Sequence, residues 1–368
     1  MFKRAKSSND TSDTEYYKIY RNLLTRLKLK SKQNYYADLV IRYGNDKSKT
    51  WRLINDISNG KRKSGISVKS LVNSKGEKLD DPKEVVDCLN EHLCSVGERM
   101  ANECPESSKD PLDYITCDIK QSANFSPTSK DEVSKLIKSL KNNKACGYDL
   151  ITNRILKETQ KVITPYLTTL FNKCIALGDF PTSYKVAKVI PLFKGGDREN
   201  PTSYRPISLL PALGKLYEKI GFTRMLDHLN ENDILSKHQF GFRQNFSTEL
   251  AILDIYEKLL YNLDKNLNTC AIFLDLAKAF DSVDHCILLR KLERYGFCGN
   301  FLNFFKSYLD GRTQFVQVGE TKSSTLPIKF GVPQGSILGP LLFLLFIVCT
   351  IAIQIRSSSL KKLLQKVG

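Results

Sequence analysis

FLDLAKAFDSVDH, the stretch from Phe273 to His285, decides how the second half of the chain is expected to fold. The residues that lead into it, 269–274, form a short and mostly apolar run that predicts a buried strand. Such a strand delivers the carboxylate of Asp275 at its end, and the ring of Phe280 follows. A carboxylate in this place is typical of a divalent-metal ligand, although a simple strand cap gives the same pattern.

The acidic residues Asp281 and Asp284 lie beyond this strand end. We expect both, and His285 with them, to cap a helix or to face solvent.

A second informative stretch, GVPQGSILGPLLF, runs from Gly331 to Phe343. The pair Val332-Pro333 stiffens the approach to Gln334, whose amide can both donate and accept hydrogen bonds. Gly335 lets the backbone approach a base or sugar closely. The pattern is typical of a binding loop, and it is also typical of a simple turn before a helix.

The charge balance favours a polyanionic partner. The 368 residues hold 56 Lys+Arg against 39 Asp+Glu, a net charge of +17, and residues 1–69 hold 17 Lys+Arg against 6 Asp+Glu. Nucleic acid is therefore the expected partner, ahead of a membrane surface. Aromatic residues are interleaved with the basic ones, where they suit either base stacking or the apolar stripe of a helix pair: Tyr16, Tyr17, Tyr20, Tyr35, Tyr36, Tyr43 and Trp51.

Cysteine usage and the two ends of the chain limit the class of protein. Ten cysteines occur without a C-x-x-C pair, so neither a zinc site nor a disulfide framework is expected. The polar start MFKRAKSSNDTSD has no secretory pattern, which favours a nuclear or cytoplasmic protein that is not secreted. The apolar run Leu338–Ile355 approaches the length of a membrane span. Gly339 and Pro340 interrupt it, so a buried helix is the favoured interpretation.

The pattern divides the chain into four regions. Residues 1–102 are expected to form a basic helical extension, 103–128 a loop-rich linker, 129–346 a compact mixed domain, and 347–368 an apolar and then basic tail. Local signals predict a short hairpin before residue 82 and strands over 187–193 and 313–318. They predict helices over 82–100, 131–140, 165–176, 247–263 and 287–295, and a further helix that ends at residue 156. Residues 206–228 are expected to begin as a loop and to continue as a helix.

Six blocks in order, from about Asn143 to Phe346, resemble the reverse transcriptase domain of non-LTR (LINE-type) retrotransposons, of jockey-like elements in particular. They are NKACGYDLITNRILK (143–157), KVIPLFKGGD (188–197), SYRPISLLPALGKLYEKI (203–220), HQFGFRQNFST (238–248), FLDLAKAFDSVDH (273–285) and GVPQGSILGPLLF (331–343). The resemblance implies an α+β fold: reverse transcriptase-like fingers and a partial palm, with helices on an antiparallel sheet, after the basic helical extension.

The resemblance also implies an RNA-directed DNA polymerase, a nucleotidyltransferase that uses two Mg²⁺ ions, deoxynucleoside triphosphates, an RNA template and a DNA primer. The roles that it implies for single residues are these: Asp275 as catalytic carboxylate and metal ligand, the backbone carbonyl of Leu276 as a further metal ligand, Lys194, Arg205, Phe280, Gln334 and Gly335 for the nucleotide, and Arg243 for the template. For Phe280 the alternative is a core aromatic, and for Lys194 a solvated surface lysine.

The family's second pair of aspartates is expected a few dozen residues after Gly331–Phe343, in an aromatic-Ala-Asp-Asp hairpin. Asp310 is the last aspartate of this sequence, so the metal site lacks most of its negative charge. A chain truncated inside the palm is expected to be inactive, since catalytic rates fall by orders of magnitude without this stabilisation. The alternative function is a non-catalytic remnant that binds nucleic acid.

Overall fold

A computed structural model describes residues 11–44, 46, 49–51, 53–54, 68–103, 110–113, 115, 119, 121–271, 273 and 275–351, without the side chains of 348–351. The chain divides into two compact units, Met1–Gly65 and Ile66–Gly368. The expected strand residues Ile272 and Leu274, and the tail beyond 351, lie outside the described residues.

The first unit is dominated by helix α2, Thr11–Tyr43. Asp13 lies in its first turn and Arg42 in its last, an arrangement that favours the helix dipole. No residue of α2 is buried, and its lysines and arginines stand beside its tyrosines, as where the Lys32 ammonium lies 5.9 Å from the Tyr36 ring centroid. The helix therefore presents cations and aromatic rings together on its surface.

The second unit contains a five-stranded sheet among its described residues. The strands are β3 (Val186–Phe193), β4 (Tyr204–Leu209), β5 (Thr313–Val318), β6 (Thr321–Lys322) and β7 (Leu326–Pro327). Their order is β4-β3-β5-β6, with β7 also paired to β5.

This sheet is mixed, so the expectation of an antiparallel sheet was wrong in one pairing. Strand β3 pairs antiparallel with β4 but parallel with β5. Parallel neighbours need a long crossover, and here the chain passes through several helices between the two strands. The mixed helix-and-sheet composition itself agrees with the α+β class.

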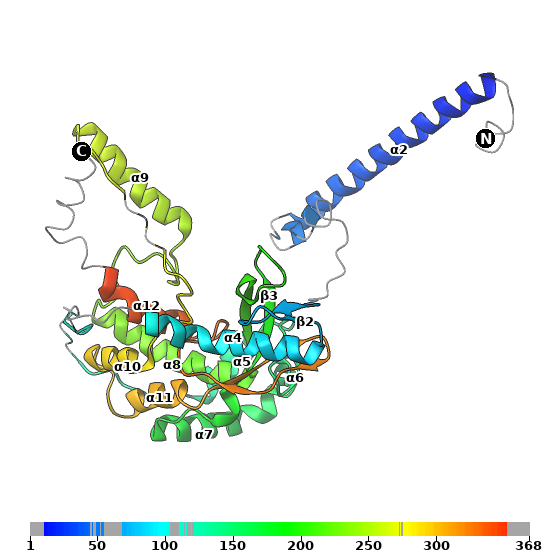
Figure 1. Ribbon diagram of the computed structural model, residues 1–368. Coiled ribbons are helices and arrows are strands. Elements are labelled where there is room, and N and C mark those ends of the chain that lie inside the picture. The colour runs from blue at the N-terminus through cyan, green and yellow to red at the C-terminus, as the bar shows by residue number, and fades with distance from the viewer. Residues whose placement is uncertain are drawn as a thin grey trace. The chain divides into compact units, whose positions relative to one another are not determined.

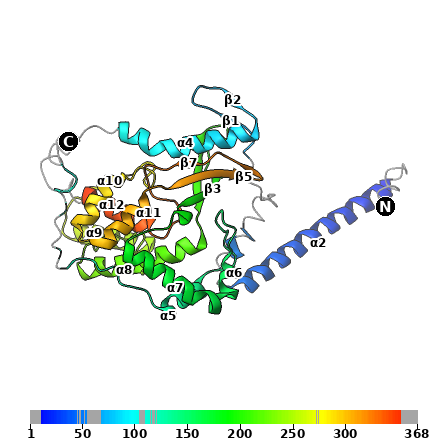
Figure 2. The ribbon, with the colours of Figure 1, turned by 90° about the horizontal axis from the view of Figure 1, so that it is seen from below.

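Helix α4 (Pro82–Glu103) and the hairpin of β1 (Leu71–Val72) and β2 (Lys78–Leu79) cover one face of the sheet (Figures 1 and 2). Val85, Val86 and Leu89 of the helix pack with Val189 of β3 and Val316 of β5, and all five are 1% exposed or less. Residues 68–103 thus belong to the same compact unit as the sheet, which differs from the boundary expected at residue 103.

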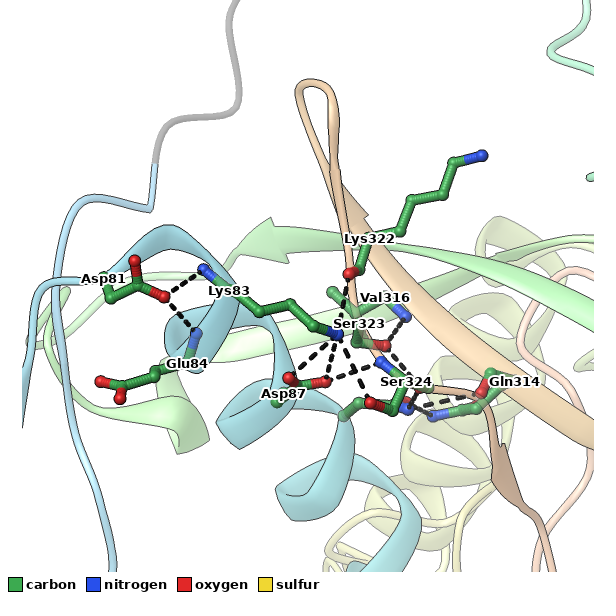
Figure 3. Close-up of polar contacts among 10 residues, drawn as sticks. Asp81, Lys83, Glu84, Asp87, Gln314, Val316, Lys322, Ser323 and Ser324 are labelled. Carbon is green, nitrogen blue, oxygen red and sulfur yellow. Dashed lines mark hydrogen bonds and ion pairs between the residues drawn. The ribbon is translucent and has the colours of Figure 1, made fainter.

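Polar contacts also join α4 to the β5–β7 segment (Figure 3). The buried Asn90 amide donates to the Ser324 carbonyl (2.8 Å) and accepts from Gln314 Nε2 (3.1 Å). Asp87 accepts from the Ser324 backbone N–H (2.7 Å) and from the Lys83 ammonium (3.2 Å). Hydrogen bonds of this kind fix the helix in register along the strand.

Helices make up the rest of the second unit, around one large apolar core. They are η1 (Thr182–Tyr184), η2 (Pro201–Ser203), α5 (Lys130–Ser139), α6 (Asn153–Glu158), α7 (Gln160–Leu177), α8 (Ala212–Glu231), α9 (Thr248–Asp264), α10 (His285–Arg294), α11 (Gly299–Leu309) and α12 (Gly339–Ile351). The side chains of Ser129, Thr152, Ser247 and Asp284 cap α5, α6, α9 and α10. Most expected helices are thereby confirmed, and so is Asp284 as a cap.

Helix α9 differs from the other helices of this unit because none of its residues is buried. Leu253, Tyr256 and Leu263 are 49%, 55% and 67% exposed. The expected amphipathic helix is present, but the described residues leave its apolar side uncovered.

Candidate functional site

The segment that carries Asp275 is exposed. Phe273 is 86% exposed, Leu276 is 52% exposed, and Asp275 itself lies on the surface. None of the described residues from Thr269 to Leu276 belongs to a strand, so the expectation of a buried strand was wrong for them. The physical reason is that a strand needs a neighbouring strand for its backbone hydrogen bonds, and no described strand pairs with this segment.

Phe280 turns back toward the protein core. Its ring stacks on Phe343 of α12 at 5.0 Å between centroids and meets the edge of Phe242 at 5.7 Å. It is half-buried and packs against the large apolar core. These contacts agree with the core-aromatic alternative, and the expected role of Phe280 toward a nucleotide stays a proposal.

Backbone hydrogen bonds join the turn after Asp275 to the loop that begins at Gly331. The Val332 N–H donates to the Phe280 carbonyl and the Gly331 N–H to the Val283 carbonyl, each at 2.8 Å. The His285 ring donates from Nε2 to the Gly331 carbonyl, also at 2.8 Å. His285 was expected at a solvated or capping position; instead it holds this loop, and burial lowers its pKa.

We refer to this contact between the turn after Asp275 and the loop from Gly331 as the joint, and Asp281 and Gln334 lie at its centre. The Gln334 amide donates from Nε2 to both carboxylate oxygens of Asp281, at 3.1 and 3.3 Å. The expectation that Asp281 caps a helix or faces solvent was therefore wrong. Burial raises the pKa of its carboxyl group, while the Gln334 hydrogen bond and the positive charge of Lys278 act in the opposite direction.

Gly335 connects the same loop to the edge of β4. Its φ is +127°, and a Cβ added to it would lie 2.6 Å from the carbonyl oxygen of Ser208. The Ser208 N–H in turn donates to the Gln334 carbonyl at 2.9 Å. Gly335 therefore does allow a close approach, but to the β4 backbone, and its expected approach to a base or sugar stays a prediction.

Lys194 and Arg205 lie on the face of the β3–β4 ribbon that α4 does not cover. Arg205 stands opposite Leu192 in the register, and side chains alternate between faces along each strand, so Arg205 and Lys194 share one face. Both side chains are exposed. The structure thus brings these two expected nucleotide-binding residues together.

Arg243 lies in the segment before α9 and interacts with its own loop. Its Nη1 donates to the Ser236 carbonyl at 2.8 Å, and its guanidinium lies 4.4 Å from the Phe246 ring centroid. Its role toward a template remains a proposal, with the guanidinium already engaged in a cation–π contact.

The residues around Asp275 do not fit a pair of divalent metal ions. Two Mg²⁺ ions need several oxygen ligands brought to one place. Among the described residues, no group of three or more Asp, Glu, His or Cys side chains gathers in such a way. Beyond Asp310 the sequence supplies no further aspartate, and after Glu320 it supplies no acidic residue at all.

The described part of the apolar run, residues 338–351, consists of α12 and the residue before it. Leu338, Leu342 and Leu345 are fully buried, and Lys291 donates to the Phe346 carbonyl. In the part of the chain that the structure describes, no helix is long and apolar enough to cross a membrane.

Two buried charged residues next to this site, Glu218 and Arg312, were not predicted, although Glu218 lies within the block 203–220. Glu218 of α8 accepts from the backbone N–H groups of Ile337 (2.6 Å) and Leu338 (3.1 Å), and burial raises its pKa. Arg312 is 1% exposed and donates to the Tyr308 carbonyl at 3.0 Å. No clear signal in the sequence indicated their burial, because Lys219 follows Glu218 directly and Arg312 lies among polar residues.

Comparison with known proteins agrees with these sequence blocks. The family model described as reverse transcriptase (RNA-dependent DNA polymerase) matches residues 194–357. The chain is 34% identical over 272 residues, 74% of its length and 30% of the relative's, to a probable RNA-directed DNA polymerase from transposon BS of Drosophila melanogaster. It is 36% identical to the RNA-directed DNA polymerase from mobile element jockey of the same organism, over 67% of this chain and 27% of that protein.

The chain spans less than a third of the length of these two curated relatives. Among solved structures, a chain of a partial Cas6-RT-Cas1–Cas2 complex superimposes with a TM-score of 0.32 and 19% identity, over 66% of this chain and 34% of that chain. That score is too low to support an argument.

Proposed function

The chain carries a reverse transcriptase domain of the non-LTR retrotransposon type, and on this premise we propose that its second unit forms the fingers and part of the palm of an RNA-directed DNA polymerase. Three sequence blocks meet at the joint of Asp281, Gln334 and Ser208, which supports a common site. In this proposal Lys194 and Arg205 bind the triphosphate, Phe280, Gln334 and Gly335 border the nucleotide, and Arg243 binds the template. A deoxynucleoside triphosphate, an RNA template and a DNA primer are the substrates.

The same proposal makes Asp275 the catalytic carboxylate and gives Mg²⁺ two ligands, the Asp275 side chain and the Leu276 backbone carbonyl. We further propose that a protein of these 368 residues binds nucleic acid without extending a primer. The single observation that supports this is the exposed, unpaired position of Asp275 with no cluster of further acidic side chains among the described residues. Without preorganised charge at the reacting phosphate, rates fall by orders of magnitude.

Binding itself is attributed to the net charge of +17 and to the basic first unit. In α2 the cations stand beside exposed tyrosines, an arrangement that suits phosphate neutralisation together with base stacking. This basic helical extension is the observation that favours the non-catalytic function as the chain's remaining activity.

One experiment separates the two functions. Primer extension on an RNA template with Mg²⁺ is measured for the full chain and for Asp275→Ala, and the affinity of both for a fluorescent single-stranded RNA is measured over a range of salt concentrations. We expect no extension, equal affinities, and binding that weakens steeply with salt. Mg²⁺-dependent extension that Asp275→Ala abolishes would overturn the inactivity, and absent or salt-insensitive binding would overturn the binding function.

A further inference from the structure

Helix α7 presents a second apolar surface in addition to the side that packs into the core. Four residues on its exposed side recur at helical spacing, and they are 68%, 75%, 40% and 74% exposed: Val162, Tyr166, Leu170 and Leu177. A helix that is apolar on more than one side is usually covered on each of them. We refer to these residues, together with Lys173 in the same row, as the α7 face.

Every charged side chain of α7 is positive. The helix contains Lys161 and Lys173 and no aspartate or glutamate. Lys173 lies three residues after Leu170 and four before Leu177, so it stands within the apolar row. Both lysines are exposed, and no ion pair involves either of them among the residues that the structure describes. The α7 face therefore offers apolar surface and unpaired positive charge.

Helix α9 presents an apolar surface of the opposite charge. It contains four acidic residues and one lysine, Lys258, which pairs with Asp254 at 2.7 Å. Glu257 and Asp264 each follow a leucine by four residues, so their carboxylates border the apolar side of the helix. Both are exposed and form no ion pair in the described part of the chain. We refer to the apolar side as the α9 face, whose residues are 37–67% exposed: Ile252, Leu253, Ile255, Tyr256, Leu259, Leu260 and Leu263.

The two faces lie apart within one copy of the chain. Figure 1 shows α7 at the lower edge of the second unit and α9 on its upper side, with α10 and α11 between them in that view. The faces can therefore meet only when they belong to two copies. Their lengths are similar, about 22 Å from Val162 to Leu177 and about 17 Å from Ile252 to Leu263, because a helix rises by roughly 1.5 Å per residue.

We propose that the α9 face of one copy packs on the α7 face of a second copy. The two apolar rows are then removed from water together, while Glu257 and Asp264 approach Lys161 and Lys173. Pairing of α7 with α7 would bring lysines together, and pairing of α9 with α9 would bring carboxylates together, so repulsion disfavours both. A contact between two different faces is heterologous. Each dimer therefore keeps one free face of each kind and can grow into a longer assembly.

The test uses three variants of equal net charge in the full chain, freed of nucleic acid by nuclease treatment. Tyr166→Lys changes the α7 face and Leu253→Lys changes the α9 face. Leu24→Lys on α2 is the control, because Leu24 and Leu253 are both 49% exposed. Assembly is measured by sedimentation velocity over a range of concentrations. We expect the unmodified chain and the control to form oligomers as the concentration rises. Each face variant alone should raise the Kd at least roughly tenfold, since a lysine replaces an apolar contact.

Mixing the two face variants is the decisive step. Tyr166→Lys keeps an intact α9 face and Leu253→Lys keeps an intact α7 face. An equimolar mixture should therefore form dimers that neither variant forms alone, and should not grow beyond dimers. Undiminished self-association of Tyr166→Lys would show that α9 pairs with α9, and that of Leu253→Lys would show that α7 pairs with α7. Either result overturns the proposal, as do a mixture without dimers, an equal loss of assembly in Leu24→Lys, or an unmodified chain that stays monomeric.

Cross-linking of the unmodified chain supplies a readout that does not depend on the folding of a variant. Isotopically light and heavy copies are mixed and treated with a carbodiimide, which forms an amide between a lysine and a carboxylate in contact. We expect cross-linked peptides of mixed isotope composition that join Lys161 or Lys173 to Glu257 or Asp264. Absence of these peptides would overturn the proposal. The proposed RNA binding is unaffected by either result, because assembly is measured without nucleic acid.

Discussion

Asn90→Leu tests whether α4 is an integral part of the second unit. Leucine has nearly the shape of asparagine, so the substitution opens no cavity and removes only polar contacts. Asn90 is fully buried, and three hydrogen bonds are lost: its amide donates to the carbonyls of Ser324 (2.8 Å) and Gln314 (3.3 Å) and accepts from Gln314 Nε2 (3.1 Å). The Ser324 carbonyl keeps a donor, because the Ser323 hydroxyl lies 2.8 Å from it. The Gln314 amide, in a residue 7% exposed, loses its acceptor.

The expected cost follows from these contacts. Three lost hydrogen bonds cost about 1 kcal/mol each, and a buried donor left without an acceptor costs about 1–3 kcal/mol more. The free energy of unfolding should therefore fall by roughly 4–6 kcal/mol, a large part of the 5–15 kcal/mol typical of a folded domain. Urea unfolding followed by circular dichroism measures it.

Two further variants make the measurement decisive. Glu91→Gln changes the next, exposed residue of α4 and should alter stability by less than about 0.5 kcal/mol. Adding Gln314→Leu to Asn90→Leu removes the unpaired donor, so the double variant should be less destabilised than the sum of the single changes. If Asn90→Leu unfolds at the same urea concentration as Glu91→Gln, α4 does not depend on these contacts and the argument fails.

Three further predictions concern the joint and α9. Burial raises the pKa of Asp281 in the folded chain, so this group stabilises the fold most below about pH 4, and the stabilisation is lost as pH rises through the folded pKa. Asp281→Asn keeps an acceptor for Gln334. The urea midpoint of this variant, relative to that of the unmodified chain, should rise between about pH 4 and pH 7, and a constant difference would contradict this expectation. Gly335→Ala places a Cβ against the Ser208 carbonyl and should lower the free energy of unfolding by about 1–3 kcal/mol, measured by calorimetry. An unchanged unfolding temperature would show that the loop moves to accommodate the methyl group. The uncovered apolar side of α9 is expected to favour self-association of the chain. Leu253→Lys should reduce this association in light scattering with an unchanged thermal transition, and equal association in the variant would mean that α9 is not the contact.

Local signals predicted those elements whose cause is local. Ser247 stands directly before an apolar-periodic segment and does cap α9, and Asp284 does the same for α10. Helix α11 was missed although Phe301, Leu302 and Phe305 recur at helical spacing, because a run rich in aromatic residues has little intrinsic preference for a helix. These outcomes depend on a few neighbouring residues.

Elements that depend on distant partners were not predictable in the same way. Strand β4 contains Pro206, which argued for a loop, yet the strand lies at the sheet edge and pairs with β3 so that Pro206 faces Pro191. Conversely, the residues around Phe273 have the composition of a buried strand and no described strand to pair with. The composition of a segment indicates whether it favours a strand, and the presence of a neighbouring strand to pair with decides whether that strand forms.

The same difference between local signals and distant partners holds for the candidate site. Family blocks identified Asp275, Gln334 and Gly335, because each block has a recognisable pattern of residues. The blocks did not show that Gln334 is already occupied by Asp281, or that Gly335 is needed for contact with β4. Both facts come from hydrogen bonds and close contacts between segments far apart in the chain. The contacts among Asp281, Gln334 and Gly335 do not involve Asp275, so Asp275→Ala should leave this part of the structure unchanged.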